Sequence, residues 1–488
     1  KRAGVIGPFF GKIFSSPSTA DGLLDRVSIW TTRLLVFSLP MTLIHPTVNP
    51  HFHRMQIAEF FSVGLLMITG FRIFFRQERV TRPNGFFISL AAYVMLLYGM
   101  ALMSNWRGPA LLESTTILYL GGTAYLIYHN ASKYLLYEDL WKWTTLTYVV
   151  ILGGGVVGII LVFFGIDTML AYQSRIIPIA LGMTDWFSSV PRVLSLMSPT
   201  ATMVAVYWAV MTLPVLTFLG MRDQKGLFRR FGIILILGIF LLGLFTLSRP
   251  FVGVVLAIYL GLRVMKWEMP LRSLLACGFL CSAIGAFSIL LFFSVLHPIG
   301  GSIQYTNDPT FKREKVEIYP SFYRPNPVYI LRDGIGLERI YIQFDYSINH
   351  YAWLKYSALK IVEEWPWFGS GPGNFTPALK RLQEKNILPR LAPEDNDEFP
   401  SAQSQYATLL AETGVVGFLA AFFLLMALVF EIAKRYRRRR DPRDLAIALS
   451  LLVLAILSID NEVMSFRWLW GLWGLSLVRY PEGTEADG

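Results

Sequence analysis

Apolar runs long enough to cross a lipid bilayer recur along almost the whole chain, and they constrain its fold more than any other feature. A helix needs about 18 or more largely apolar residues to cross a hydrocarbon core of about 30 Å. Of the 488 residues, 54% are hydrophobic and only 16% are charged. Soluble domains carry about 25% charged residues. The sequence therefore predicts an all-α, polytopic membrane protein.

Twelve transmembrane spans are predicted, nine before a long polar segment and three after it. They cover residues 28–45, 56–75, 86–103, 111–128, 142–165, 199–220, 231–247, 251–265, 273–296, 406–433, 444–459 and 465–479. The predicted parts of the chain are an N-terminal segment (1–27), spans 1–9 (28–296), a large loop (297–405), spans 10–12 (406–480) and a tail (481–488).

Basic clusters set the orientation of these spans. Each cluster follows an even-numbered span, as the arginines at 72, 76, 79 and 82 and the basic run at 434–440 illustrate. Cytoplasmic loops carry an excess of Lys and Arg, so both termini are predicted in the cytoplasm of a bacterium and the 297–405 loop outside. The same clusters explain the net charge of +11 without a nucleic-acid partner, for which no motif is present.

The large loop is predicted to fold as a small cap over the membrane domain. Residues 351–364 have helical spacing, with Trp353, Tyr356, Leu359 and Val362 on one stripe. A glycine cluster at 369–373 ends this helix, and a second helix is predicted at 377–385. The cluster follows no strand and lacks the P-loop lysine, so a tight turn is favoured over a nucleotide site.

Arginines are the first candidates for chemistry on the outer side. Arg249 lies between two spans, where its planar donors suit a lipid phosphate or pyrophosphate. An arginine that extends to outer headgroups explains the position equally well. Arg324, Arg332 and Arg339 of the loop are candidates for further substrate contacts, although ordinary solvated charge is the commoner reason for any one of them.

Titratable groups near the same surface are the next candidates. His350 is a candidate general base because its ordinary pKa lies near neutrality. Glu412, at the start of the tenth span, is either functional or a helix cap. Asp460 and Glu462, in the outer turn after the eleventh span, are suited to orient or deprotonate a sugar hydroxyl, or are simply solvated. No metal site is predicted.

Two segments and one arginine resemble the O-antigen ligase and polymerase family. Residues 404–417, SQYATLLAETGVVG, are similar to the sequence that closes the large loop in that family. Residues 365–375, WPWFGSGPGNF, look like the family's helix, proline and G-x-G-x-x-x-F pattern. Arg249 matches the family's phosphate-binding arginine, and the topology agrees over the whole chain.

The resemblance implies a GT-C-like membrane glycosyltransferase of the bacterial cytoplasmic (inner) membrane, with its active site facing the periplasm. Such an enzyme takes a glycan linked to undecaprenyl pyrophosphate and transfers it to an acceptor sugar, without a nucleotide sugar, cofactor or metal. Its expected partners are the lipid-linked oligosaccharide, membrane lipids and a chain-length regulator protein.

The sequence departs from the family pattern in two respects. Many members carry an arginine at the start of the helix before the Pro-x-x-Gly segment, and here that place falls near His350 and Tyr351. Gln403 stands where the ligases carry a histidine, and glutamine cannot act as a base. Either His350 or a loop arginine replaces that histidine, or the acceptor is held differently. Arg249, His350, Glu412 and Gln403 are the predicted catalytic residues. The predicted substrate-binding residues are Arg249, Arg324, Arg332, Arg339, Gln405 and Tyr406.

The missing histidine favours a polysaccharide polymerase that extends a glycan on the lipid carrier. The alternative is a ligase that transfers polymer to lipid A core. A transporter of a small solute such as bicarbonate is an alternative of another class. It is disfavoured because the spans carry few charges and form no paired halves. A lipid flippase would lack a large outer cap.

Overall fold

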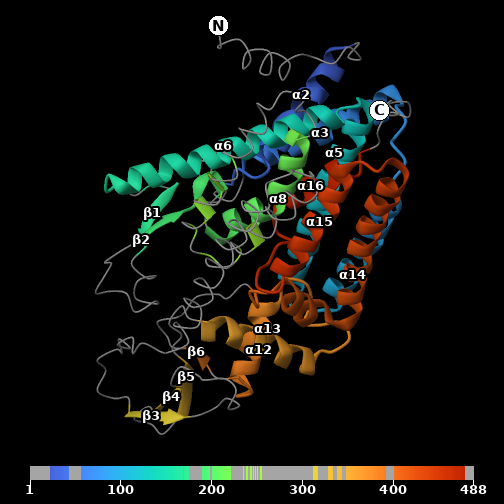
Figure 1. Cartoon of the computed structure of the whole chain (residues 1–488). Coiled ribbons are helices and arrows are strands. Elements are labelled where there is room, and N and C mark those ends of the chain that lie inside the picture. The colour runs from blue at the N-terminus through green and yellow to red at the C-terminus, as the bar shows by residue number, and fades with distance from the viewer. Residues whose placement is uncertain are drawn as a thin grey trace.

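The computed structural model describes residues 22–42, 56–166, 168, 170–174, 190–197, 201–220, 312–316, 328–332, 338–342, 348–388, 390–391 and 401–478, together with isolated positions between 235 and 254. Helices dominate this part of the chain (Figure 1). They are α2 (Leu23–Ser38), α3 (Ile57–Arg76), α4 (Gly85–Met103), α5 (Arg107–Lys133), α6 (Tyr137–Phe163), α8 (Ala201–Gly220), α12 (Ile348–Glu364), α13 (Phe375–Glu384), α14 (Gln405–Arg439), α15 (Pro442–Leu457) and α16 (Arg467–Ser476).

Six of the described helices are long and apolar enough to cross a membrane, so the chain is a multi-pass membrane protein. They are α3, α4, α5, α6, α8 and α14. The predicted spans at 28–45, 444–459 and 465–479 correspond to α2, α15 and α16, which have 16, 16 and 10 residues. The spans predicted at 231–247, 251–265 and 273–296 lie largely outside the described residues. The predicted count of twelve therefore stays a prediction.

Helix α3 presents a broad apolar surface on the outside of the bundle. Met67, Phe74 and Phe75 are 69%, 82% and 76% exposed. Soluble monomers rarely expose contiguous apolar surface on this scale. In a bilayer, such side chains contact lipid tails, which agrees with α3 as a membrane span.

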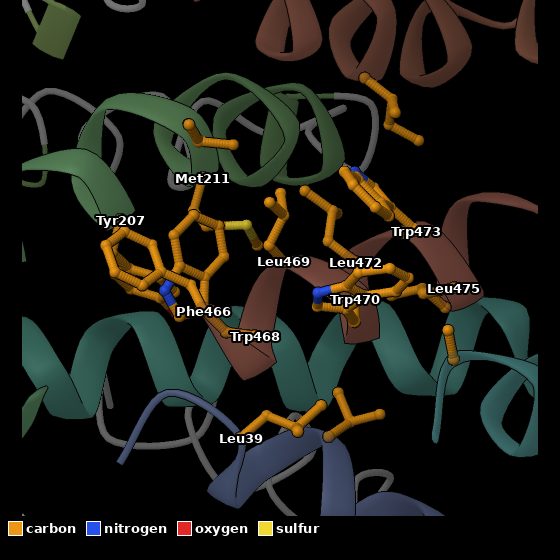
Figure 2. Close-up of a cluster of buried hydrophobic side chains, with 14 of the residues drawn as sticks. Leu39, Tyr207, Met211, Phe466, Trp468, Leu469, Trp470, Leu472, Trp473 and Leu475 are labelled. Carbon is orange, nitrogen blue, oxygen red and sulfur yellow. The ribbon is translucent and has the colours of Figure 1, made fainter. Parts of the chain in front are cut away.

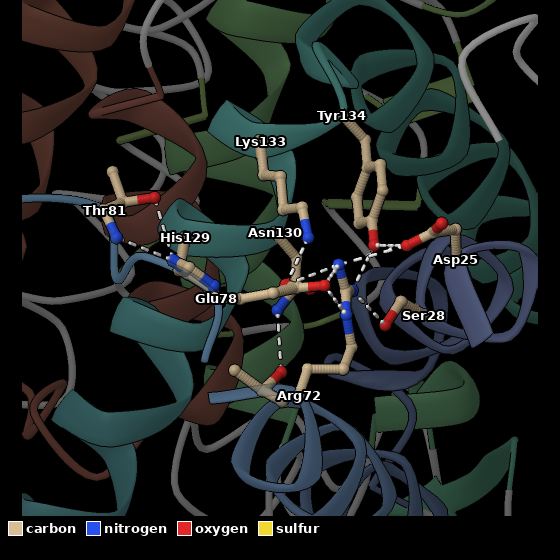
Figure 3. Close-up of polar contacts among 10 residues, drawn as sticks. Asp25, Ser28, Arg72, Glu78, Thr81, His129, Asn130, Lys133 and Tyr134 are labelled. Carbon is tan, nitrogen blue, oxygen red and sulfur yellow. Dashed lines mark hydrogen bonds and ion pairs between the residues drawn. The ribbon is translucent and has the colours of Figure 1, made fainter. Parts of the chain in front are cut away.

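Buried ion pairs tie the helices together at the end of the bundle that carries the basic clusters. Arg72 of α3 is only 2% exposed, and its guanidinium pairs with Asp25 (3.0 Å) and Glu78 (2.8 Å) (Figure 3). Glu78 also pairs with Lys133 at the end of α5. A buried charge is tolerated when it is paired and hydrogen-bonded in this way. The network therefore fixes the ends of α2, α3 and α5 relative to one another.

Helix α16 fills the centre of the membrane domain with tryptophans (Figure 2). Trp468, Trp470 and Trp473 are at most 3% exposed. The rings of Trp470 and Trp473 lie 4.8 Å apart, and Trp468 meets Tyr207 of α8 edge-on at 5.2 Å. Helix α16 is too short to cross a bilayer by itself, and the burial of its large rings against neighbouring helices stabilises it inside the membrane domain.

The structure also has two small sheets, which the all-α prediction did not include. The first pairs β1 (Ala171–Ser174) with β2 (Val190–Val193) in antiparallel fashion. The second has the order β3 (Lys312–Val316), β4 (Val328–Arg332), β5 (Glu338–Ile342) and β6 (Arg390–Leu391). Its β5–β6 pair is parallel and the other two pairs are antiparallel. The predominance of helix is confirmed, and the second sheet adds strands to the predicted cap.

The two helices predicted within the large loop, here called the cap helices, are confirmed as α12 and α13, which lie next to the start of α14 (Figure 1). That the loop covers the membrane domain from outside stays a prediction. Together with α14 they enclose a small apolar core of their own, which includes Leu354, Ala358, Ile361, Phe375, Leu379 and Ala411. The predicted apolar stripe was wrong, because Leu359 is 57% exposed while Leu354 and Ile361 are fully buried. The face of α12 that is buried is the one turned to α13 and α14.

Candidate functional site

Helix α14 is broken at Gly414, and the glycine-rich loop at 365–374 lies across the break. Gly414 has φ 61° and ψ −168°, so the backbone is not helical there. A break frees backbone N–H and C=O groups, which need partners where water is excluded. Four loop hydrogen bonds provide them: Ser370 N to Ala411 O (3.0 Å), Gly371 N to Glu412 O (2.8 Å), Val415 N to Pro366 O (2.9 Å) and Val416 N to Trp367 O (3.1 Å).

Glycine is required on both sides of this contact. A Cβ atom on Gly369, where φ is +67°, would lie 2.3 Å from the backbone of Glu412. A Cβ atom on Gly414 would lie 2.4 Å from the carbonyl group of Trp367. Any larger residue would separate the loop from the helix. The two motifs that are about 40 residues apart in the sequence are therefore one structural unit.

The side chain of Glu412 completes this unit. Its carboxyl oxygens accept hydrogen bonds from the backbone N–H groups of Gly373 (2.8 Å) and Phe375 (3.2 Å). These donors lie at the start of α13, where N–H groups have no partner within the helix. The side-chain carboxyl of Glu412 therefore caps α13 and fixes the loop to α14. Its predicted catalytic role stays a prediction.

The loop is also fixed to the turn between α4 and α5. The fully buried Asn374 donates from Nδ2 to Ser104 Oγ (2.8 Å) and to the carbonyl of Trp106 (3.2 Å). The ring of Trp106 meets Trp365 edge-on at 6.2 Å. These contacts bring α4, α5, α13 and α14 together at the end of the bundle opposite the buried Arg72.

A cavity of about 190 Å³ lies beneath this junction. Three glutamates from different elements line it: Glu113 of α5, Glu412 of α14 and Glu462 of the turn between α15 and α16. Its other polar lining residues are Tyr93, Gln405, Thr408, Thr413 and Ser465. Such a lining of acids, hydroxyls and an amide is suited to hydrogen-bond a ligand rich in hydroxyl groups.

The turn that carries Glu462 is held against both α14 and the cap. Glu462 accepts a hydrogen bond from the hydroxyl of Thr408. Burial raises the pKa of the Glu462 carboxyl, and hydrogen bonds from Thr408 and Ser401 offset part of that rise. Asp460, its neighbour in the predicted pair, instead forms an ion pair with Lys355 of α12. Of the two predicted carboxylates, only Glu462 lines the cavity.

Three of the predicted site residues stand at the start of α14. Gln405 is 9% exposed and lines the cavity. Tyr406 does not line it, and its hydroxyl donates to the carbonyl of Ala455 in α15 (2.7 Å). Gln403 has a left-handed backbone, with φ 54°, and its N–H donates to Ser401. It is not among the lining residues either.

The remaining predicted residues are described in part or not at all. His350 lies in the first turn of α12, and Arg332 and Arg339 lie in β4 and β5. The side chains of these three residues, and the whole of Arg249 and Arg324, lie outside the described residues. Gly253, four residues after Arg249, packs against Leu457 at the end of α15, directly before the turn that carries Glu462.

Glu113 is not among the predicted site residues, although the sequence carries a signal for it. Glu113 is the only charged residue in the predicted span at 111–128. An ionisable residue within a span is a candidate functional residue by default, because its burial in lipid is unfavourable. The predicted carboxylates all lie at or near the ends of predicted spans, whereas Glu113 lies about two turns inside α5.

Comparison with known protein families finds a match that includes the glycine-rich loop and the start of α14. Residues 231–422 match the family model described as O-antigen ligase. The matched region is similar to O-antigen ligases over these residues. It includes the cap helices, the glycine-rich loop and the break in α14, while Glu113 and Glu462 lie outside the matched residues. No curated protein sequence matches the chain. The predicted resemblance is thereby confirmed.

Proposed function

We propose that the protein transfers a glycan from undecaprenyl pyrophosphate to a hydroxyl group of an acceptor sugar, and that the cavity at the α14 break binds the acceptor. The observation that carries this proposal is the polar cavity, with its three glutamates, at the junction of the two O-antigen ligase motifs. Carboxylates and amides bind sugar hydroxyls well, and a carboxylate can accept the proton of a hydroxyl that attacks.

The donor would be held from the other side of the same junction. A departing pyrophosphate develops negative charge, which arginine stabilises with its planar set of donors. Arg249 is the proposed clamp. In support, Gly253 packs against Leu457, and Leu457 precedes by five residues the Glu462 that lines the cavity. Loop arginines such as Arg324, Arg332 and Arg339 are proposed as additional contacts to the pyrophosphate.

The glutamine at position 403 favours a polymerase over a ligase. The described lining of the cavity contains no histidine, and Gln403 stands at the position of the ligase histidine. The acceptor would then be a lipid-linked repeat unit in the periplasmic leaflet of the cytoplasmic membrane. A chain-length regulator is the proposed protein partner, since a polymerase by itself sets no chain length. Metal independence stays a prediction.

The test is a reconstitution of the purified protein with undecaprenyl-pyrophosphate-linked repeat units. A ladder of products without any added acceptor, lost in Arg249→Ala, is the expected result. Arg107→Ala is the matched control, because Arg107 is an exposed arginine at the same end of the bundle, and the ladder should persist. Transfer only after lipid A core is added would make the protein a ligase. No transfer to either acceptor would overturn the proposal.

A further inference from the structure

The amide group of Gln405 has a fixed orientation. Its Oε1 accepts hydrogen bonds from the N–H groups of Val463 (3.0 Å) and Met464 (2.9 Å) in the turn between α15 and α16. An amide whose oxygen is held by two donors cannot rotate freely, so its NH₂ group is directed as well. Within the described part of the chain this NH₂ group makes no hydrogen bond, although the residue is only 9% exposed and lines the cavity.

Tyr93 presents a second free donor to the same cavity. The side chain comes from α4, is only 4% exposed and lines the cavity. Its hydroxyl has no hydrogen-bond partner among the described residues. Buried tyrosine hydroxyls usually find a partner, and an unpaired one is unfavourable. A ligand that supplies an acceptor would satisfy the hydroxyl of Tyr93 and the amide of Gln405 together.

Glu113 presents a free carboxyl to these two donors. Neither a hydrogen bond nor an ion pair holds its carboxyl within the described residues, whereas Glu412 caps α13 and Glu462 accepts from Thr408. The Cβ of Glu113 lies against Gly373 of the glycine-rich loop. Of the three cavity glutamates, Glu113 is therefore the one whose oxygens are left for a ligand.

We infer that Tyr93, Gln405 and Glu113 form the subsite for the attacking hydroxyl of the acceptor sugar, with Glu113 as its base. The inference rests on the proposed function and deepens it. The hydroxyl oxygen accepts from the amide of Gln405 or the hydroxyl of Tyr93 and donates its proton towards the carboxylate of Glu113. One oxygen bound by donors and by an acceptor at the same time has a fixed position, which is what an in-line attack requires.

The reaction balances with these groups. The acceptor oxygen forms the new bond to the anomeric carbon, and its proton passes to the carboxylate of Glu113. The bond between the anomeric carbon and the pyrophosphate oxygen breaks, and undecaprenyl pyrophosphate leaves with the electron pair. The proton on Glu113 then returns to water. No acid is needed on the donor side, because pyrophosphate is a stable anion.

Kinetics of three variants test this subsite in the reconstituted reaction. Tyr93→Phe removes one hydroxyl and should raise KM for the repeat unit about fivefold, the effect of one hydrogen bond, with kcat little changed. Tyr98→Phe is the matched control on the same helix, since the Tyr98 hydroxyl is bonded to Thr115 outside the cavity. Gln405→Glu preserves the oxygen that holds Val463 and Met464 but removes the donor, and should raise KM similarly.

Glu113→Gln should lower kcat by about 10²-fold, which is the usual effect of losing a general base. It should also abolish the rise of kcat with pH, a change that a merely structural role would not produce. Among the described residues, the other titratable groups that face Glu113 are Tyr93, Glu412 and Glu462, so the pH profile is measured in Tyr93→Phe as well. Glu113→Asp should recover part of the activity.

The outcomes separate the inference from the function on which it rests. A ladder from the wild-type protein together with wild-type kcat, KM and pH profile in Tyr93→Phe and Glu113→Gln would overturn the subsite but leave the glycosyltransferase intact. If Glu113→Gln does not fold, the KM values of Tyr93→Phe and Gln405→Glu test the subsite instead. Wild-type KM values in both variants would then overturn it. No transfer by the wild-type protein to either acceptor would overturn the function and the subsite with it.

Discussion

Glu412 connects two motifs through a single side chain. Its carboxyl group caps α13 from α14, and its backbone carbonyl accepts from Gly371 of the same loop. A hydrogen bond to a buried carboxylate contributes about 1.5–3 kcal/mol to stability, more than a bond between neutral groups. At the scale of single residues, a position that the sequence predicts to be catalytic or a helix cap is thus a structural link between loop and helix.

Substitution of Glu412 should therefore destabilise the protein whether or not it is catalytic. We expect Glu412→Gln to lower the free energy of unfolding by about 1–3 kcal/mol, because one of the two backbone N–H groups loses its acceptor. Denaturant-induced unfolding in detergent measures this change. Glu431→Gln on the same helix is the control, since Glu431 accepts a single exposed bond from Gly85 and should lose no more than about 0.5 kcal/mol. Equal effects would show that the Glu412 cap is unimportant.

The pKa of Glu462 predicts a dependence of stability on pH. Burial raises this pKa in the folded state, whereas the unfolded chain has the ordinary value of about 4.3. Between these two values the unfolded state holds fewer protons, so stability should fall as pH rises through this window. Thermal unfolding from about pH 4.5 to pH 7 measures the slope, which Glu462→Gln should reduce. Glu384→Gln, on the exposed face of α13, should keep it. An unchanged slope in Glu462→Gln would contradict the prediction.

The break in α14 is the main feature at the scale of elements. The sequence predicts one continuous span at 406–433, and the structure confirms a helix there but interrupts it at Gly414. The interruption is stable because the loop at 365–374 satisfies the backbone groups that it frees. Helical periodicity gives no sign of it, since the apolar pattern continues on both sides. Only the partner loop explains why the glycine is not helical.

A side chain at Gly414 should undo this contact. Gly414→Ala requires both a left-handed backbone and a Cβ atom 2.4 Å from the carbonyl of Trp367, so we expect a loss of at least about 2 kcal/mol. Faster proteolysis of the 365–374 loop should accompany it. Gly99→Ala in α4 is the control, because a Cβ there meets nothing within 4 Å and alanine is favoured over glycine by about 1 kcal/mol in a helix. Wild-type stability in Gly414→Ala would exclude the docking described above.

The molecule as a whole has two chemically distinct ends. One carries the basic clusters and the buried Arg72, and the other carries the cap helices and the polar cavity. The ends of α3 and α5 meet at the first, and the junction of α4, α5, α13 and α14 forms the second. This arrangement agrees with the positive-inside prediction, in which the cap faces the periplasm.

Labelling of single cysteines in spheroplasts tests this orientation. In a chain with Cys277 and Cys281 replaced by alanine, Glu384→Cys on the exposed face of α13 should react with a maleimide that cannot cross membranes. Arg438→Cys, at the exposed end of α14, should react only after lysis. The reverse pattern would place the cap in the cytoplasm and remove the glycan donor from the proposed site.

The sequence by itself determined the membrane class, most of the described helices, the resemblance to O-antigen ligases and several of the residues that line the cavity. These follow from properties that are local along the chain: apolar length, basic clusters, glycine positions and short motifs. The tertiary structure alone decided that the two motifs dock on each other, that α12 buries the face of Leu354 rather than that of Leu359, and that Glu113 joins the cavity. Each of these depends on which distant segment supplies the partner for a freed backbone group or an apolar face, and no local pattern specifies that partner.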